Sequence, residues 1–271
     1  MIDPDFHHCM ELARQARRPL YAAILFAPEN ARGALWAMAA LDIELSRIPD
    51  LVTQSLAGQM RLQWWREALT GNAAYEPGSN PVMRALNAAF AAHAMSATRL
   101  LPLINAHESL LFDVCFETRA DMEQYIAARH GTLAQAAIDV CCAAMGAPPQ
   151  NVPAHIVTAM GLHDLLNNVH AKAARGHCLV PLDLLHAHGL QSGDFMADTL
   201  SAPAQPILRA LREEALEAAR AGADEWRALP RAARLALLPF LLAQSELRRA
   251  PDATPSSYLV QLWILWRAVR R

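Results

Sequence analysis

The stretch GLHDLLNNVHAKAARGHCLVP, residues 161–181, carries the pattern that decides the fold of this chain. Its first part is typical of an apolar helix, on which Asp164, Asn168 and Lys172 lie four residues apart along one face. Gly176 is expected to close the helix, because glycine readily adopts the left-handed backbone conformation that many helix ends require. A carboxylate, an amide and the single lysine of the chain in one row indicate a candidate site, although such a row also fits a solvated helix face.

A second helix carries a similar polar row. In ALWAMAALDIELSRIPD, residues 34–50, Asp42, Ser46 and Asp50 again lie four residues apart, and Arg47 stands beside them. Polar rows on two otherwise apolar helices favour an arrangement in which the rows face each other across a cavity.

Composition limits the class of protein. The chain has 271 residues, 54% hydrophobic content and a net charge of −2, which suits one sizeable core and argues against nucleic acid as a partner. Five cysteines without CxxC spacing indicate reduced thiols in a cytosolic setting. The acidic start MIDPDFHHCM does not resemble a targeting segment. No run shows the sustained alternation that is typical of half-buried strands, so the sequence gives no sign of a β-sheet.

Several motifs resemble those of the squalene/phytoene synthase family, the head-to-head prenyl transferases of the all-α isoprenoid synthase fold. The second motif of that family, NxxxDxxxD followed by RGRxYLP, aligns with the polar row of the first helix and with RGHCLVP at residues 175–181. The first motif, DDxxD, falls on SRIPD at residues 46–50, and the family's YxxxxxG helix fits around Tyr125. The resemblance covers residues 15–245. It implies an all-α fold with one domain over residues 1–271, a helical bundle around a central cavity.

The departures from these motifs argue against the chemistry of the family. Mg²⁺ takes oxygen ligands, but the first two acids of DDxxD are Ser46 and Arg47, so that Asp50 alone remains. The last acid of the second motif is Lys172, whose ammonium repels a metal ion. Pro49 is also expected to strain or end its helix near that point. Binding of Mg²⁺ in the family manner is therefore not expected, nor is any other cofactor.

One branch of the family lacks the aspartate motifs and resembles the assembly factors of respiratory complex I (NADH dehydrogenase). Residues 45–69, together with Glu44 before them, carry the ELxxIxD turn and the RLQWWRxAL helix of that branch. The resemblance implies a pseudoenzyme that acts as a binding or assembly factor, with a respiratory-chain subunit or assembly protein as its partner. The alternative is a prenyl transferase that acts on farnesyl or geranylgeranyl diphosphate with Mg²⁺ in a rearranged site, where the acids would be Asp42, Asp50 and Asp164.

Without a metal, the charges of the two rows need other partners. Lys172 is expected to pair with Asp50 across the cavity, or to reach toward Asp164 with Asn168 between them. Alternatively, three cations bind the phosphate of a prenyl diphosphate or a lipid directly, namely Arg47, Lys172 and Arg175.

Other residues extend the candidate site. Tyr21, Tyr125 and His107 are candidates for the cavity wall, and Tyr21 also fits a packing role. His130 fits a structural histidine, a pH-sensitive residue or a metal ligand.

The final segment, residues 251–271, contains the weakly amphipathic stretch YLVQLWILWRAVRR. Leu259, Trp263 and Trp266 share one side of the expected helix, and arginines follow at its end. Such a helix lies in a membrane interface, or it packs on the body with its arginines favoured by the helix dipole. The unpatterned cysteines and the acidic start predict a cytoplasmic protein, and this helix adds the alternative of peripheral contact with the inner face of the membrane.

Overall fold

The computed structural model describes residues 3–52, 54–71, 80–112, 115–199, 201–250 and 254–270. The described residues form helices and one isolated parallel bridge, between Cys115 and Cys178, with no strand among them. The expected all-α class is therefore confirmed. In chain order the helices, including the 3-10 segment η2 and the π segment η3, are α1 (Pro4–Ala16), α2 (Arg18–Leu25), α3 (Glu29–Leu51), α4 (Ser55–Thr70), α5 (Pro81–His93), η2 (Ala97–Leu100), α6 (Leu101–Phe112), α7 (Arg119–Ile126), η3 (Ala127–Gly131), α8 (Thr132–Ala144), α9 (Ala154–Ala173), α10 (Leu182–Ala187), α11 (Ser192–Ala197), α12 (Ala204–Ala228), α13 (Arg231–Ala236), α14 (Leu238–Leu247) and α15 (Tyr258–Val269).

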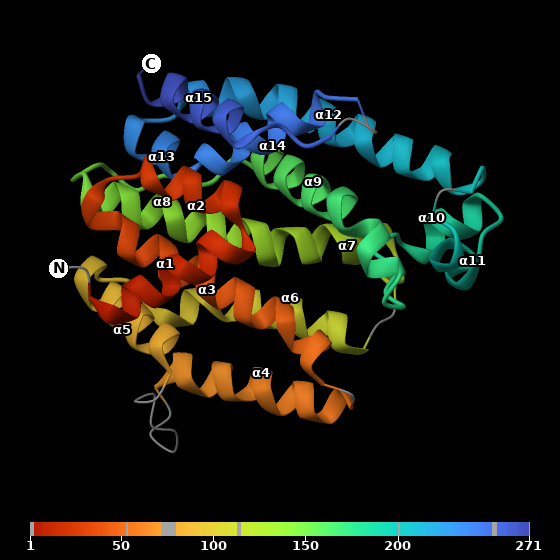
Figure 1. The fold of residues 1–271 in the computed structure, drawn as a ribbon, viewed down its shortest axis with the longest axis horizontal. Coiled ribbons are helices and arrows are strands. Elements are labelled where there is room, and N and C mark those ends of the chain that lie inside the picture. Colours follow the sequence, from red (N-terminus) through yellow and green to blue (C-terminus); the bar gives the residue numbers. More distant parts are fainter. Residues whose placement is uncertain are drawn as a thin grey trace.

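The longer helices run side by side in stacked layers (Figure 1). Helix α4 forms one edge of the molecule, α12 and α15 lie at the opposite edge, and α3, α7, α8 and α9 pass between them. Most of α3 is buried, from Ala31 to Ile48, because its apolar residues meet neighbours on several sides. The two helices with polar rows, α3 and α9, thus lie in the interior of the bundle.

Helix α3 is longer than expected. The helix passes through Pro49 and ends at Leu51, whereas Pro49 was expected to strain or end it. A proline removes one backbone donor, and near the C-terminus of a helix the loss affects few further hydrogen bonds. The extension keeps Asp50 on the same helix as Asp42.

The segment from Arg119 to Ala144, which contains Tyr125, forms two α-helices joined by a π turn. Helix α7 ends at Ile126, the π turn η3 covers Ala127–Gly131, and α8 follows. A π turn accommodates one residue more than an α-helical turn, and it is frequently found at functional sites. Arg129 and His130 both lie in η3, and both are buried.

Helix α9 ends as its sequence indicates. The helix stops at Ala173, and Gly176 has a positive φ of 79° in the turn that follows. Another glycine of α9, Gly161, allows the helix to pass close to α7. A Cβ atom placed on Gly161 would lie 2.2 Å from Cγ2 of Ile126, a distance that real Cβ contacts do not show.

We expect Gly161→Ala to lower the free energy of unfolding by about 1–3 kcal/mol, because the added methyl group overpacks the contact with Ile126. Urea unfolding measures the change. The matched control is Gly193→Ala, where the new Cβ meets no atom within 4 Å and the stability should stay equal or rise. The double variant with Ile126→Ala should lose less stability than the sum of the two single variants. An additive result would contradict the proposed contact.

Candidate functional site

A cavity of about 790 Å³ lies between the two helices with polar rows. Residues of α1, α2, α6, α7, η3, α8, α13, α14 and α15 also contribute to its wall. All eight residues of the two degenerate motifs line this cavity, namely Asp42, Ser46, Arg47, Asp50, Asp164, Asn168, Lys172 and Arg175. The rows of α3 and α9 therefore face a common space.

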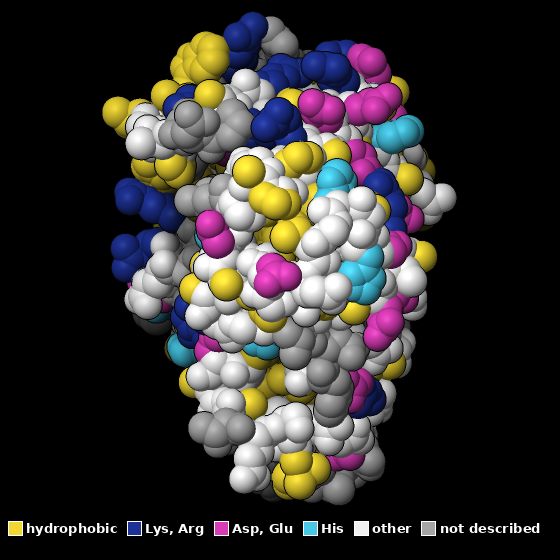
Figure 2. All heavy atoms as spheres, turned by 90° about the vertical axis from the view of Figure 1, so that its right-hand side faces the viewer, with side chains coloured by type: hydrophobic (Ala, Val, Ile, Leu, Met, Phe, Trp, Pro, Cys, Tyr) yellow, Lys and Arg dark blue, Asp and Glu magenta, His cyan; other side chains and the backbone are white. Residues whose placement is uncertain are grey.

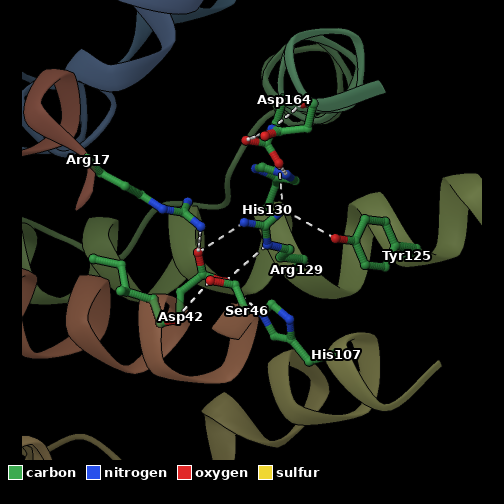
Figure 3. Close-up of polar contacts among 10 residues, drawn as sticks. Arg17, Asp42, Ser46, His107, Tyr125, Arg129, His130 and Asp164 are labelled. Atoms are coloured by element: carbon green, nitrogen blue, oxygen red, sulfur yellow. Dashed lines mark hydrogen bonds and ion pairs between the residues drawn. The ribbon is translucent and has the colours of Figure 1, made fainter. Parts of the chain in front are cut away.

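Asp42 is the most buried carboxylate of the cavity, with 1% of its surface exposed. Arg129 donates from Nε to Oδ1 at 3.0 Å and from Nη2 to Oδ2 at 3.2 Å. Arg17 approaches Oδ2 with Nη2 at 2.9 Å, and Nε2 of His107 lies 2.8 Å from Oδ1. Two guanidinium groups and one imidazole thus surround a single carboxylate (Figure 3).

Asp164 on α9 shares the same arginine. Nη1 of Arg129 donates to Oδ2 of Asp164 at 2.5 Å and to the hydroxyl oxygen of Tyr125 at 3.2 Å. Asn168 donates to the backbone carbonyl of Asp164 at 2.7 Å and to its Oδ1 at 3.3 Å. Nε2 of His130 lies 3.6 Å from Oδ2 of Asp164 (Figure 3). Arg129 therefore bridges the carboxylates of α3 and α9.

The protonation states follow from burial and from these partners. Burial alone would raise the pKa of Asp42, but the charges of Arg129 and Arg17 outweigh that effect and hold the pKa well below its usual range. For Asp164 burial acts in the same upward direction, and Arg129 again holds the pKa well below its usual range. Burial lowers the pKa of His107, so the imidazole is neutral at pH 7 and donates to Asp42 from Nε2.

This donor set does not fit Mg²⁺. The ion requires several oxygen ligands, commonly carboxylates, at short distance. Here both oxygens of Asp42 and Oδ2 of Asp164 receive hydrogen bonds from arginine, and within the described ranges no three acidic, His or Cys side chains group as metal ligands. The guanidinium of Arg129 stands between the two acids and supplies positive charge to both.

The rim of the cavity pairs differently from expectation. Lys172 was expected to pair with Asp50 or to reach toward Asp164, but Asp50 binds Arg175 at 2.9 Å and Asp164 binds Arg129. The part of the chain that the structure describes contains no carboxylate within ion-pair distance of Lys172. Burial lowers the pKa of Lys172, and the nearby charge of Asp50 partly offsets that effect.

Of the three further candidates for the cavity wall, two line the cavity and one does not. His107 and Tyr125 line the cavity, and both take part in the network around Arg129. Tyr21 was proposed for the cavity wall as well, but it is not among the cavity-lining residues of the described chain. Its ring instead stacks on Trp36, with ring centroids 6.5 Å apart, so the packing role is the one observed.

Two functional residues were missed by sequence reasoning, Arg17 and Arg129. Arg17 lies at the junction of α1 and α2, where nothing in the local pattern marks it. Arg129 offered one signal, because it follows Tyr125 by four residues in an alanine-rich stretch and must share its apolar surroundings. An arginine in such a position needs a carboxylate partner, which spacing alone does not identify.

Replacing Asp42 with Asn should lower the free energy of unfolding by about 3–5 kcal/mol, because it leaves the buried guanidinium of Arg129 undercompensated. The control is Asp50→Asn, which breaks an ion pair whose side chains are 40% and 56% exposed. That change should cost about 0–1 kcal/mol. Urea unfolding compares the two variants, and equal losses would contradict the assigned roles.

Acid should weaken the fold in two steps. The pKa of His107 is lowered in the folded state, so stability is lost as the pH falls below the unfolded value of about 6.5. The lowered pKa values of Asp42 and Asp164 add a second loss below about pH 4. In His107→Gln the fall in unfolding free energy between about pH 7 and pH 5 should be smaller than in the wild type. Parallel curves from urea titrations over this range would disprove the role of His107.

The amino-acid sequence of this chain is similar to those of known proteins. The family model for squalene/phytoene synthase matches residues 13–263. The chain is 26% identical over 194 residues to "NADH dehydrogenase (ubiquinone) complex I, assembly factor 6" of Rattus norvegicus, covering 71% of this chain and 58% of that protein. The Homo sapiens protein of the same name is 24% identical over 190 residues, covering 70% of this chain and 57% of its own length. The chain thus spans less than two thirds of the length of these curated relatives.

Solved structures show the same fold. A ligand-bound dehydrosqualene synthase superposes with a TM-score of 0.73 at 17% identity, covering 97% of this chain and 95% of that chain. A squalene synthase from Alicyclobacillus acidocaldarius has a TM-score of 0.70 at 18% identity, covering 90% of this chain and 91% of its own. At these identities the likeness is one of fold.

Proposed function

Because the chain belongs to the squalene/phytoene synthase family, we propose that it keeps the family fold without metal-dependent prenyl transfer and acts as an assembly factor for respiratory complex I. The observation that carries the proposal is the bridge that the buried guanidinium of Arg129 forms to Asp42 and Asp164. These carboxylates face the cavity from the two motif helices, and a guanidinium holds both.

The chemistry of the alternative explains why this bridge matters. Ionising an allylic diphosphate separates charge, and an enzyme must stabilise the departing diphosphate with strong, fixed positive charge. Mg²⁺ could supply that charge only if Asp42 or Asp164 released Arg129, which would leave a buried guanidinium without its partners. Asp50, the remaining acid of the first motif, is engaged by Arg175. Prenyl transfer through these acids is therefore disfavoured.

The relatives support the assembly role. Both mammalian proteins reported above are named as complex I assembly factors. We propose that this chain contacts a subunit or an assembly protein of the same respiratory complex, at the inner, cytoplasmic face of the membrane. Within its described ranges, no helix is long and apolar enough to cross a bilayer.

The cavity itself favours a second candidate function, binding of an anionic amphiphile without turnover. Its rim carries the ammonium of Lys172, whose pKa is lowered by burial and for which the described residues provide no carboxylate partner. Its other end is apolar, with Leu20, Leu35, Met38 and Leu242 in the wall. A prenyl diphosphate or an anionic lipid matches this combination of charged rim and apolar end.

Two assays test the main proposal together. Purified protein should release no pyrophosphate from farnesyl or geranylgeranyl diphosphate, with or without Mg²⁺ and NADPH. Deletion of the gene for this protein in the organism that encodes it should lower the amount of assembled complex I on native gels, and re-expression should restore that amount. Mg²⁺-dependent release that is lost in Asp164→Ala, or normal complex I in the deletion strain, would contradict the proposal.

The second candidate has a separate readout. Farnesyl diphosphate without Mg²⁺ should raise the thermal unfolding midpoint more than inorganic pyrophosphate does, because only the former also fills the apolar end. Lys172→Met should reduce the rise, and the exposed control Arg231→Met on α13 should not. No shift with either compound would rule out this ligand class.

A further inference from the structure

The last helix, α15, presents an unpartnered apolar face. Four of its large hydrophobic side chains are exposed, with exposed fractions of 76% for Leu259, 44% for Val260, 54% for Trp263 and 45% for Trp266. Their positions repeat at three or four residues, so they follow one side of the helix. Exposed tryptophans in such a stripe are unusual for a surface in contact with water alone.

The opposite side of α15 fixes the orientation of this face. Leu265 is fully buried, and Leu262 and Ile264 pack against the core. The guanidinium of Arg18 on α2 lies 4.2 Å from the ring centroid of Tyr258 at the start of the helix. Because α15 is held to the body along its length, its tryptophans cannot turn inward without unpacking the helix.

Two arginines stand among the exposed aromatic rings. The guanidinium of Arg267 lies 5.2 Å from the ring centroid of Trp263, and that of Arg270 lies 4.0 Å from that of Trp266. The stretch from Tyr258 to Val269 contains no acidic residue. Each exposed tryptophan is thus paired with a cation, and no carboxylate of the same helix competes for those cations.

We propose that α15 is a membrane-docking helix that lies flat on a bilayer containing anionic lipids. Indole rings favour the boundary between headgroups and acyl chains, because they combine an apolar body with an N–H donor. Guanidinium groups at the same depth match phosphate headgroups in charge and geometry. A helix of 12 residues is far too short to span the bilayer, so it lies along the surface. The proposal does not depend on the assembly role.

The edge of the molecule that carries α15 has a mixed surface. At the upper edge in Figure 2, where Figure 1 places α12 and α15, hydrophobic and basic side chains occur together, with acidic side chains beside them. The central cavity also reaches this region, because Gln261 of α15 and Pro255 before it contribute to its wall. Docking through α15 would therefore bring one end of the cavity toward the lipid.

Vesicle co-sedimentation of the whole chain tests the proposal. The protein should bind vesicles of phosphatidylcholine with phosphatidylglycerol, and added salt should weaken the binding. The double variant Trp263→Ala, Trp266→Ala should bind at least about tenfold more weakly, and Arg267→Gln, Arg270→Gln should lose about tenfold on the anionic vesicles. Circular dichroism should show the wild-type fold in both variants.

The matched control is Leu56→Ala with Met60→Ala on α4, at the opposite edge of the molecule. These side chains are 62% and 68% exposed, so the variant removes similar exposed apolar surface and should bind as the wild type does. Three results would overturn the proposal: no binding by the wild type, equal losses in the control and α15 variants, or equal wild-type binding to pure phosphatidylcholine. If the wild type forms a dimer, the tryptophan variant is monomeric and neither binds vesicles, the exposed face of α15 instead binds a second copy of this chain.

Discussion

The guanidinium of Arg129 touches both carboxylates that matter in the interior of this protein, Asp42 on α3 and Asp164 on α9. Arg129 and Asp42 are buried, whereas the side chain of Asp164 is 29% exposed at the cavity. If Asp42 or Arg129 lost its partner, it would meet little water and its desolvation would be uncompensated. This one side chain therefore links α3, η3 and α9 through polar contacts, and His107, Tyr125 and Arg17 complete the network around it.

Charge balance explains how a polar centre persists inside an apolar bundle. The centre holds two carboxylates, Asp42 and Asp164, and two guanidinium groups, Arg17 and Arg129, so it is neutral as a whole. Fully satisfied polar networks rigidify an interior, whereas partly satisfied ones destabilise it. At the rim, Asp50 neutralises Arg175, and Lys172 remains as positive charge. The centre of the cavity thus carries no surplus charge, whereas its edge keeps the positive charge of Lys172.

The sequence was sufficient for part of this arrangement. Both polar rows could be predicted, because each lies within one helix and the four-residue spacing is visible along the chain. The partners could not, since Arg129 is separated from Asp42 by 87 positions and from Asp164 by 35. Lys172 was the obvious cation in the motif, yet its helix directs Asp164 toward Arg129 instead. The prediction that Pro49 strains or ends α3 was wrong about the end of the helix, which is at Leu51. Pro49 lies in the last turn, where the missing backbone N–H affects few further helical hydrogen bonds.

The extra residue of the π turn η3 bears on how this site could have arisen in evolution. The turn holds one residue more than an α-helical turn, and each added residue rotates the rest of a helix by about 100°. Arg129 and His130 face the cavity within this turn, while α7 and α8 on either side keep their apolar residues in the core. Loss of a single codon here would restore a regular helix and change the direction of Arg129 relative to one flank. A lineage could therefore have acquired or lost the bridge through one insertion or deletion, an event that comparisons of substitution patterns alone would overlook.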